Sequence, residues 1–221
     1  MGALAREIEG RLSDPELVPW LMETCCLERA AAENLVRYIA RQRERSAVPT
    51  DRRVVVEGFP DEAGGLRVAI LTPFGGRFHL AWLLALQATF REDLHLVPDS
   101  LHSEGGILLR FTGVPFGRVL EAIRSLTPEG LEEHLLSEVL SSPLFGLRFR
   151  QNAARALLLP RGRPVRRTPL WLQRLRARDL LAAAMSQEGF PIVTETLREI
   201  FSDFLPVEEL KDFLGRLKAG T

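Results

Sequence analysis

The sequence of 221 residues contains only two cysteines, and these are adjacent, Cys25 and Cys26. Neighbouring cysteines do not fit the relaxed geometry of a disulfide, and two thiols do not complete a zinc site. The sequence also lacks an apolar run long enough to cross a bilayer, and its polar N-terminus lacks the apolar core of a signal peptide. These absences predict a reduced, cytoplasmic protein that has no membrane partner.

The motifs of several enzyme classes are missing as well. The sequence has no G-x-x-x-x-G-K-[ST] phosphate loop, no H-E-x-x-H zinc motif and no G-x-S-x-G nucleophile elbow. Its four histidines are scattered, and no cysteine lies beside them at the spacing of metal ligands. We therefore expect no catalytic residue, no metal and no cofactor in this chain, and we predict that it is not an enzyme on its own.

Lysine is almost absent, because only Lys211 and Lys218 stand among the 29 basic residues and the other 27 are arginines. The chain is neutral overall, with 29 acidic residues, yet ten arginines and no acid lie between Glu138 and Asp179. A GC-rich genome favours arginine codons everywhere and explains the scarcity of lysine. It does not explain the acid-free segment, which is typical of a surface that binds a polyanion.

The hydrophobic pattern predicts an α+β protein that is mainly helical, with a small mixed ββαββ sheet between N-terminal helices and a C-terminal helical bundle. We expect an N-terminal helical segment at residues 1–50, the ββαββ unit at 51–113 and an arginine-rich helical part at 114–221, packed together as one compact domain. The expected strands are residues 53–59, 66–72, 94–98 and 107–112, with a helix at 77–91.

Proline and threonine mark the starts of the C-terminal helices. Thr127-Pro128 and Thr168-Pro169 each combine an N-cap residue with a proline suited to the first turn. Residues 160–167 lie between two helices and form a loop rich in arginine and proline. The expected helices are residues 116–125, 128–140, 144–158, 169–186, 191–204 and 207–217.

The loop arginines are the first candidate site. Arg161, Arg163, Arg166 and Arg167 belong to a proline-bearing loop that has no core to serve, so we expect them to bind phosphate. The planar guanidinium group suits this role because it grips a phosphate through two parallel hydrogen bonds. Arg155, at the end of the preceding helix, belongs to the same nucleic-acid-binding set.

The helix after the loop carries the second part of this site. Trp171, Arg174 and Arg178 are three, four and seven positions apart, which places an indole and two guanidinium groups on one helix face. Such a face suits a single strand and its bases. Alternatively, Trp171 is a core residue and the arginines pair with the acidic remainder of the chain. For Trp171 alone we favour the core role, and for the loop arginines we favour phosphate binding.

Residues 72–77, Thr-Pro-Phe-Gly-Gly-Arg, join a strand to the start of a helix. Backbone N–H groups at a helix start bind anions, and Arg77 is placed to assist them. An ordinary turn is the alternative, and the pattern alone favours it.

The segment at residues 154–174, ARALLLPRGRPVRRTPLWLQR, closely resembles the signature of the DEAD/H-associated domain of the large helicase-related (Lhr) family of superfamily 2 helicases. The segments at 48–52, 72–75 and 190–192 fall in the order of that family, so the resemblance covers nearly the whole chain. The sequence departs from the family pattern at Gly162 and Val165, and at Gly105, where a second acid is usual.

The resemblance implies a nucleic-acid-binding accessory domain that completes the single-strand channel beside the motor and winged-helix domains of an ATP-dependent DNA helicase linked to DNA repair. Its partners would be single-stranded DNA or an RNA:DNA hybrid, and the motor in cis or in trans. ATP and Mg²⁺ would bind the motor domains, whose motifs these residues lack. The alternative is an interdomain scaffold that docks on the motor without touching nucleic acid.

Overall fold

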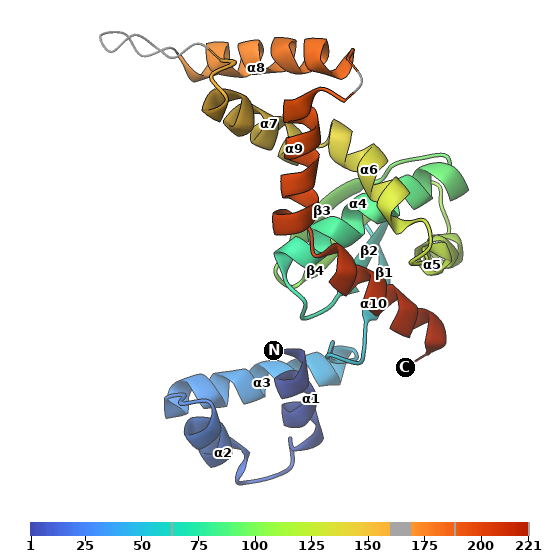
Figure 1. Cartoon of the computed structure of the whole chain (residues 1–221). Coiled ribbons are helices and arrows are strands. Elements are labelled where there is room, and N and C mark those ends of the chain that lie inside the picture. Colours follow the sequence, from blue (N-terminus) through green and yellow to red (C-terminus); the bar gives the residue numbers. More distant parts are fainter. Residues whose placement is uncertain (63, 160–168, 188, 221) are drawn as a thin grey trace. The chain divides into compact units, whose positions relative to one another are not determined.

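A computed structural model describes residues 1–62, 64–159, 169–187 and 189–220. These residues form two compact units, the first made of residues 1–79 and 98–120 and the second of residues 80–97 and 121–220. Helices dominate both units, and the strands belong to the first (Figure 1). Among the described helices, none combines the length and the apolar character that crossing a membrane requires.

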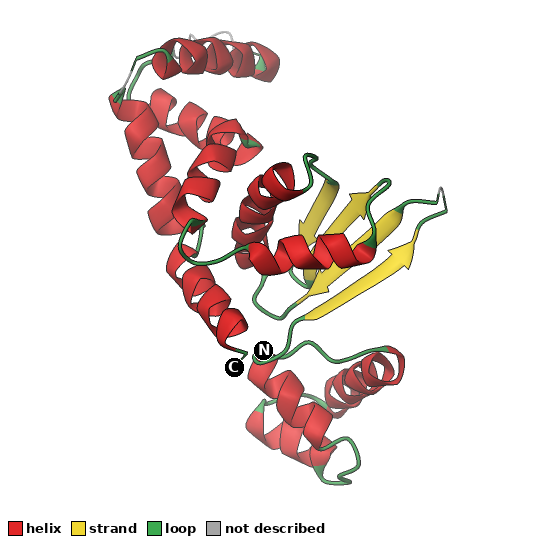
Figure 2. Cartoon of the chain, turned by 90° about the vertical axis from the view of Figure 1, so that its right-hand side faces the viewer, coloured by secondary structure: helices red, strands yellow, loops and turns green. Residues whose placement is uncertain are grey.

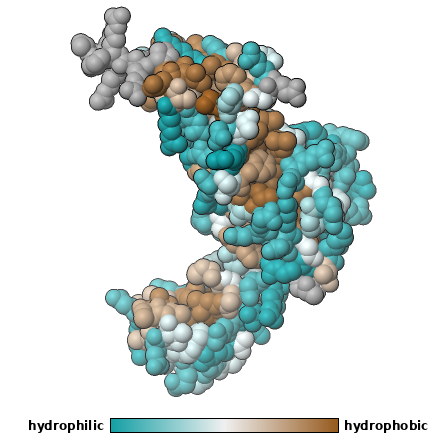
Figure 3. Space-filling view, viewed as in Figure 1, coloured by the Kyte–Doolittle hydropathy of each residue, from teal (hydrophilic) through white to brown (hydrophobic). Residues whose placement is uncertain are grey.

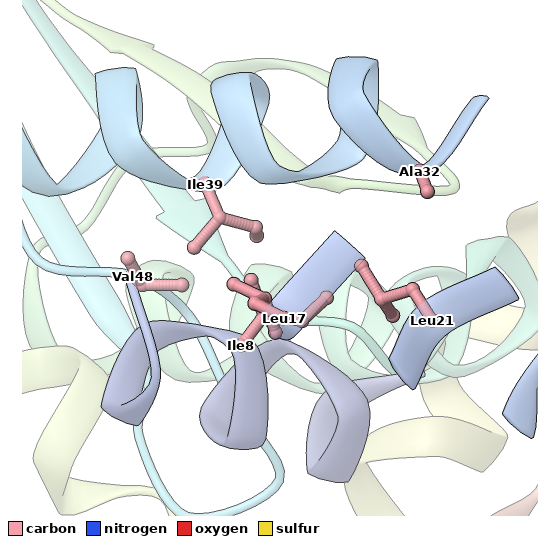
Figure 4. Close-up of a cluster of buried hydrophobic side chains, with 6 residues drawn as sticks. All are labelled: Ile8, Leu17, Leu21, Ala32, Ile39 and Val48. Carbon is pink, nitrogen blue, oxygen red and sulfur yellow. The ribbon is translucent and has the colours of Figure 1, made fainter. Parts of the chain in front are cut away.

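Three N-terminal helices of the first unit share a small apolar core. They are α1 (Gly2–Gly10), α2 (Leu17–Thr24) and α3 (Arg29–Arg45). Apolar side chains from all three helices point toward one another, and Val48 joins them from the segment that follows α3 (Figure 4). The helical character expected for this part of the chain is confirmed.

The sheet of the first unit has four strands, β1 (Val55–Pro60), β2 (Leu66–Leu71), β3 (Asp99–Ser103) and β4 (Gly106–Phe111). They lie in the order β1-β2-β4-β3, and every neighbouring pair is antiparallel (Figure 2). The α+β class is confirmed, but the pairing is antiparallel throughout rather than mixed.

The third strand was predicted at the wrong place. Residues 94–98 are apolar enough to suggest a strand, whereas the structure forms β3 from residues 99–103, which are polar except for Leu101. The reason is the tight hairpin with β4, in which Ser103 pairs with Gly106 across a turn at Glu104 and Gly105. Gly106 also permits the close approach of β4 to β2, because a Cβ atom there would lie 2.2 Å from the carbonyl oxygen of Ile70.

The two faces of the sheet differ in burial. One face carries Val68, Ile70, Ile107, Leu109 and Phe111, all of which are fully buried. Residues on the other face remain accessible, as expected for an antiparallel sheet that is covered on one side. The exposed large apolar residues there are Phe59, Leu101 and Leu108.

The second unit is helical. It contains most of α4 (Gly76–Asp93) and part of α5 (Phe116–Ser125), and then α6 (Leu131–Ser141), α7 (Pro143–Arg155), α8 (Leu170–Met185), α9 (Pro191–Glu199), the π-helix η1 (Ile200–Phe204) and α10 (Val207–Ala219). In its core the rings of Trp82 and Phe213 meet edge to face at 5.0 Å, and Arg91 forms an ion pair with the buried Glu138.

Several helix boundaries of the second unit differ from the sequence prediction, and the helix expected at 144–158 already ends at Arg155. The helix expected from residue 128 begins at Leu131, after the N-cap residue Gly130, so Thr127-Pro128 precedes it rather than caps it. The helix expected at 191–204 changes to π-helical winding at Ile200, and it ends before Leu205, whose extended backbone suits the residue that precedes Pro206. Residue Thr168, the other predicted N-cap, lies outside the described residues.

Candidate nucleic-acid interface

Helix α8 presents its indole to solvent, since 66% of Trp171 is exposed. The prediction that Trp171 is a core residue is therefore wrong. The fully buried residues of α8 are Ala177 and Ala184, and Leu172, Leu180 and Leu181 are half-buried, whereas Trp171 lies on the exposed part of the helix. Apolar surface is visible along α8, and it includes the exposed residues Leu170 and Leu175 (Figure 3).

Two of the predicted arginines share this exposed helix with Trp171. Arg174 and Arg178 are both exposed, and the helical winding of α8 places them one and two turns after the indole. An exposed aromatic ring beside guanidinium groups is a surface on which bases stack while phosphates bind. The exposure of Trp171 therefore supports the hypothesis that this face of α8 binds nucleic acid.

A groove of about 450 Å³ lies between α7 and α8. Its walls include small and apolar residues of both helices, and its charged lining residues are Arg150 from α7 and Arg174 and Arg178 from α8. None of the described residues that line it is acidic. The sequence analysis did not single out Arg150, although it lies in the acid-free segment. The packing of α7 against α8 brings Arg150 to this site, and a sequence does not display that packing.

The charges of the groove are little compensated by the chain itself. Neither Arg150 nor Arg174 forms an ion pair with a side chain in the part of the chain that the structure describes. Arg178 lies 3.6 Å from the adjacent Asp179, and both side chains are mostly exposed, at 75% and 64%. An exposed pair of this kind contributes little, so the groove keeps most of its positive charge.

Arg148, in the same helix, shows that not every arginine of the acid-free segment serves this surface. Its side chain is 19% exposed, and it pairs with Glu199 of α9 at 3.3 Å. Its guanidinium group also lies 3.5 Å above the ring of Phe204. Asn152 donates to Glu199 at 2.7 Å in the same cluster. Arg148 therefore fastens α7 to α9 and the π-helix.

The remaining predicted arginines of the segment divide into two groups. Arg155 is exposed at the end of α7 and lies 3.4 Å from the side-chain oxygen of Asn152. The loop arginines Arg161, Arg163, Arg166 and Arg167 lie outside the described residues, so their role stays a prediction.

The family is settled by comparison with known proteins. The sequence model of the family described as DEAD/H associated matches residues 48–221. The chain belongs to this family. The resemblance drawn from residues 154–174 is thereby confirmed.

The relatives of this DEAD/H associated chain are Lhr helicases. The Lhr helicase/uracil glycosylase of Escherichia coli (strain K12) is 36% identical over 213 residues, which are 96% of this chain and 14% of that protein. The Lhr helicase/probable uracil glycosylase of Mycolicibacterium smegmatis is 38% identical over 191 residues, which are 85% of this chain and 12% of that protein.

A solved structure shows the same fold. The Mycobacterium smegmatis helicase Lhr bound to single-stranded DNA and AMP-PNP is similar with a TM-score of 0.88 at 34% identity, over 99% of this chain and 28% of that chain. The DEAD/H associated chain thus corresponds to less than a third of the length of each of these relatives.

The predicted anion site at the start of α4 holds a carboxylate of the chain itself. The backbone N–H of Gly76 donates to Glu104 Oε2 at 3.0 Å, so the turn between β3 and β4 supplies the anion. Arg77 beside it is exposed and has an interaction of its own within the chain. In this DEAD/H associated chain an internal carboxylate thus occupies the start of α4, and a nucleic-acid contact at Arg77 stays a prediction.

The start of α4 also contains a buried histidine that the sequence analysis did not single out. His79 Nε2 lies 2.6 Å from the hydroxyl of Thr72, and its Nδ1 lies 2.7 Å from the carbonyl oxygen of Ser103. Only a protonated Nδ1 can donate to that carbonyl, so Thr72 donates to Nε2 of a neutral ring. Burial lowers the pKa of His79 from its ordinary value, because the charged ring would lose its hydration.

The described residues of the DEAD/H associated chain form no cluster of metal-ligating side chains. No three histidine, cysteine, aspartate or glutamate side chains come together there in an arrangement that would hold a metal ion. The chemistry that the described surface offers is the binding of an anion and an aromatic ring.

Proposed function

We propose that this chain is a nucleic-acid-binding accessory domain of an Lhr-type ATP-dependent DNA helicase, and that it completes the single-strand channel beside the motor and winged-helix domains. The observation that carries this proposal is the exposed indole of Trp171 on the same helix as Arg174 and Arg178. The indole stacks on a base, and the guanidinium groups neutralise the phosphates that flank it.

The relatives support a helicase context for this activity. A similar solved structure is of a helicase bound to single-stranded DNA, and the matching relatives are named as Lhr helicases. In the proposal the partner of this chain is single-stranded DNA or an RNA:DNA hybrid, and the motor acts in cis or in trans. ATP and Mg²⁺ bind the motor, the chain itself hydrolyses no ATP, and the assembly serves DNA repair.

A scaffold is the second candidate function, and the open face of the sheet favours it. Leu101 is 65% exposed and Leu108 is 36% exposed, and Phe59 lies on the same face. Exposed apolar side chains on one face mark surfaces that contact other proteins. In this reading the chain docks on the motor through the sheet, and α8 touches no nucleic acid.

Salt-dependent binding of a single strand by the chain alone tests the proposed function. Arginines that contact phosphates release counterions, so the affinity must fall as salt rises. With about three to five phosphates engaged, log K falls with log[salt] at a slope of roughly −2 to −3.5. Fluorescence anisotropy of a labelled oligothymidylate measures this slope. An absence of binding at low salt, or a flat response, favours the scaffold.

A further inference from the structure

We propose that the groove between α7 and α8 seats one backbone phosphate of a single strand, and that Arg150, Arg174 and Arg178 are its ligands. The indole of Trp171 then stacks on the base of the adjoining nucleotide. This inference rests on the proposed function, and it adds the register of the strand and a residue of α7 to it.

The first reason is the convergence of like charges. Three arginine side chains from two helices line one groove of about 450 Å³. Like charges brought together repel one another, and no carboxylate among the described lining residues offsets this repulsion. An anion bound between the helices removes the repulsion, and a phosphate accepts several forked hydrogen bonds at once.

The second reason is the contrast with Arg148. Two positions before Arg150 on α7, Arg148 points away from the groove and is neutralised by Glu199. The chain therefore supplies an acid where an arginine serves packing, and it supplies none where α7 faces α8. On α8, Arg176 is exposed and does not line the groove, so it serves as a reference arginine outside the site.

The third reason is the composition of the walls. Gly146 and Ala177 leave room between the helices, and Leu147 and Leu181 give the groove apolar sides. Apolar walls limit the screening of charge by water and so strengthen the attraction between a guanidinium group and a phosphate.

The spacing along α8 sets the register. Trp171 precedes Arg174 by three positions and Arg178 by seven, which is about 4.5 Å and about 10.5 Å along the helix axis. This reach is on the scale of one nucleotide, so a strand with its phosphate in the groove brings the neighbouring base to the indole. A base must be unpaired to stack in this way, and the ligand is therefore single-stranded.

Matched arginine variants of the full chain test the proposed phosphate site in the groove. The probe is a labelled oligothymidylate of about twelve nucleotides, within the size range of single-strand sites. Arg150→Gln removes a groove ligand, and Arg176→Gln removes an exposed arginine of α8 outside the groove, so the two variants lose the same charge.

Removing a charge-assisted contact weakens binding by about 10-fold in Arg150→Gln, and the slope of log K against log[salt] becomes shallower by roughly 0.7. Arg176→Gln is expected to lose less than about 2-fold. Arg150→Gln combined with Arg174→Gln is expected to lose less than the product of the single losses, because the two arginines share one phosphate. Thermal melting verifies that each variant is folded. If Arg150→Gln does not fold, Arg174→Gln is compared with Arg176→Gln in its place.

If Arg150→Gln and Arg176→Gln lose the same affinity for the strand, the proposed phosphate site is wrong. The proposed function then remains intact, because the arginines attract the strand through their overall charge and not through one site. Strictly multiplicative losses in the double variant overturn the proposed phosphate site as well. If the unmodified chain binds no single strand at all, the proposed function fails and the phosphate site fails with it, and that outcome is distinct from the other two.

An abasic strand of the same length tests the register. Trp171→Ala is expected to weaken binding of oligothymidylate by roughly 10-fold and to leave binding of the abasic strand within about 2-fold. Equal losses for the two strands contradict stacking on the indole. Trp82 is fully buried, so it does not compete as a stacking partner.

Discussion

Helices α4 and α8 are of similar length, at 18 and 16 residues, and they use their side chains in opposite ways. In α4 most residues are buried, among them Phe78, Trp82 and Phe90. In α8 the buried residues are Ala177 and Ala184, while the indole of Trp171 is exposed. Each helix carries a tryptophan and arginines, so composition alone does not separate them.

The two helices differ in whether their arginines and tryptophans have partners within the chain. Arg91 of α4 pairs with the buried Glu138 of α6, and Trp82 packs on Phe213 of α10. Arg174 of α8 has no such partner among the described residues, and Trp171 lies in solvent. A side chain that contributes little to folding is free to serve binding. We infer that α4 holds the second unit together and that α8 is its contact surface.

Paired tryptophan truncations give the largest expected effect. Trp82→Ala removes a ring that is 0% exposed and leaves a cavity, so it should lower the free energy of unfolding by roughly 3–5 kcal/mol. Trp171→Ala removes an exposed ring and should lower it by less than about 0.5 kcal/mol. Chemical denaturation measures both values. A loss of stability in Trp171→Ala that equals the loss in Trp82→Ala would show that the comparison of the two helices is wrong.

A pair of arginine truncations gives a smaller effect. Arg148→Ala removes the ion pair with Glu199 and the contact with the ring of Phe204 from a largely buried cluster, so we expect a loss of roughly 1–3 kcal/mol in stability. Single-strand binding should change little. Arg174→Ala should do the reverse, with stability within about 0.5 kcal/mol of the unmodified chain and weaker binding. Melting and anisotropy on the same two samples measure both quantities.

The sequence predicted well those elements that local pattern controls. The helix at 116–125 was placed without error, and the strand pair at residues 53–72 was recovered as β1 and β2. Residues 99–103 were missed because they are polar except for Leu101, and they form a strand by pairing with β4. Strand propensity depends on neighbours across the sheet, and a single sequence does not display those neighbours.

The sequence predicted the charge of the site, but it did not predict which side chains each of its residues contacts in the fold. The acid-free arginine segment identified α8, and helical spacing placed Trp171 with Arg174 and Arg178 on one face. Burial of Trp171 was wrongly expected, because a tryptophan in an amphipathic helix is more often packed than exposed. Arg150 was missed and Arg148 was not separated from it, because only the packing of α7 between α8 and α9 decides which arginine meets an acid.

The pH dependence of stability gives the smallest expected effect, and it sharpens the comparison because α4 contains the buried His79 while α8 contains no histidine. The pKa of His79 is lowered by burial in the folded chain, so the folded ring stays neutral while the unfolded chain takes up a proton near its ordinary value of 6.5. The unfolded state then binds more protons, and the free energy of unfolding falls as the pH falls below about 6.5 toward the folded pKa. One proton limits this slope to about 1.4 kcal/mol per pH unit. Denaturation between pH 8 and pH 5 should show the slope in the unmodified chain and in the exposed-site control His95→Gln, and a shallower slope in His79→Gln, since glutamine does not titrate. If His79→Gln keeps the full slope, the acid sensitivity comes from elsewhere, and the junction of Thr72, His79 and Ser103 is not the titrating element.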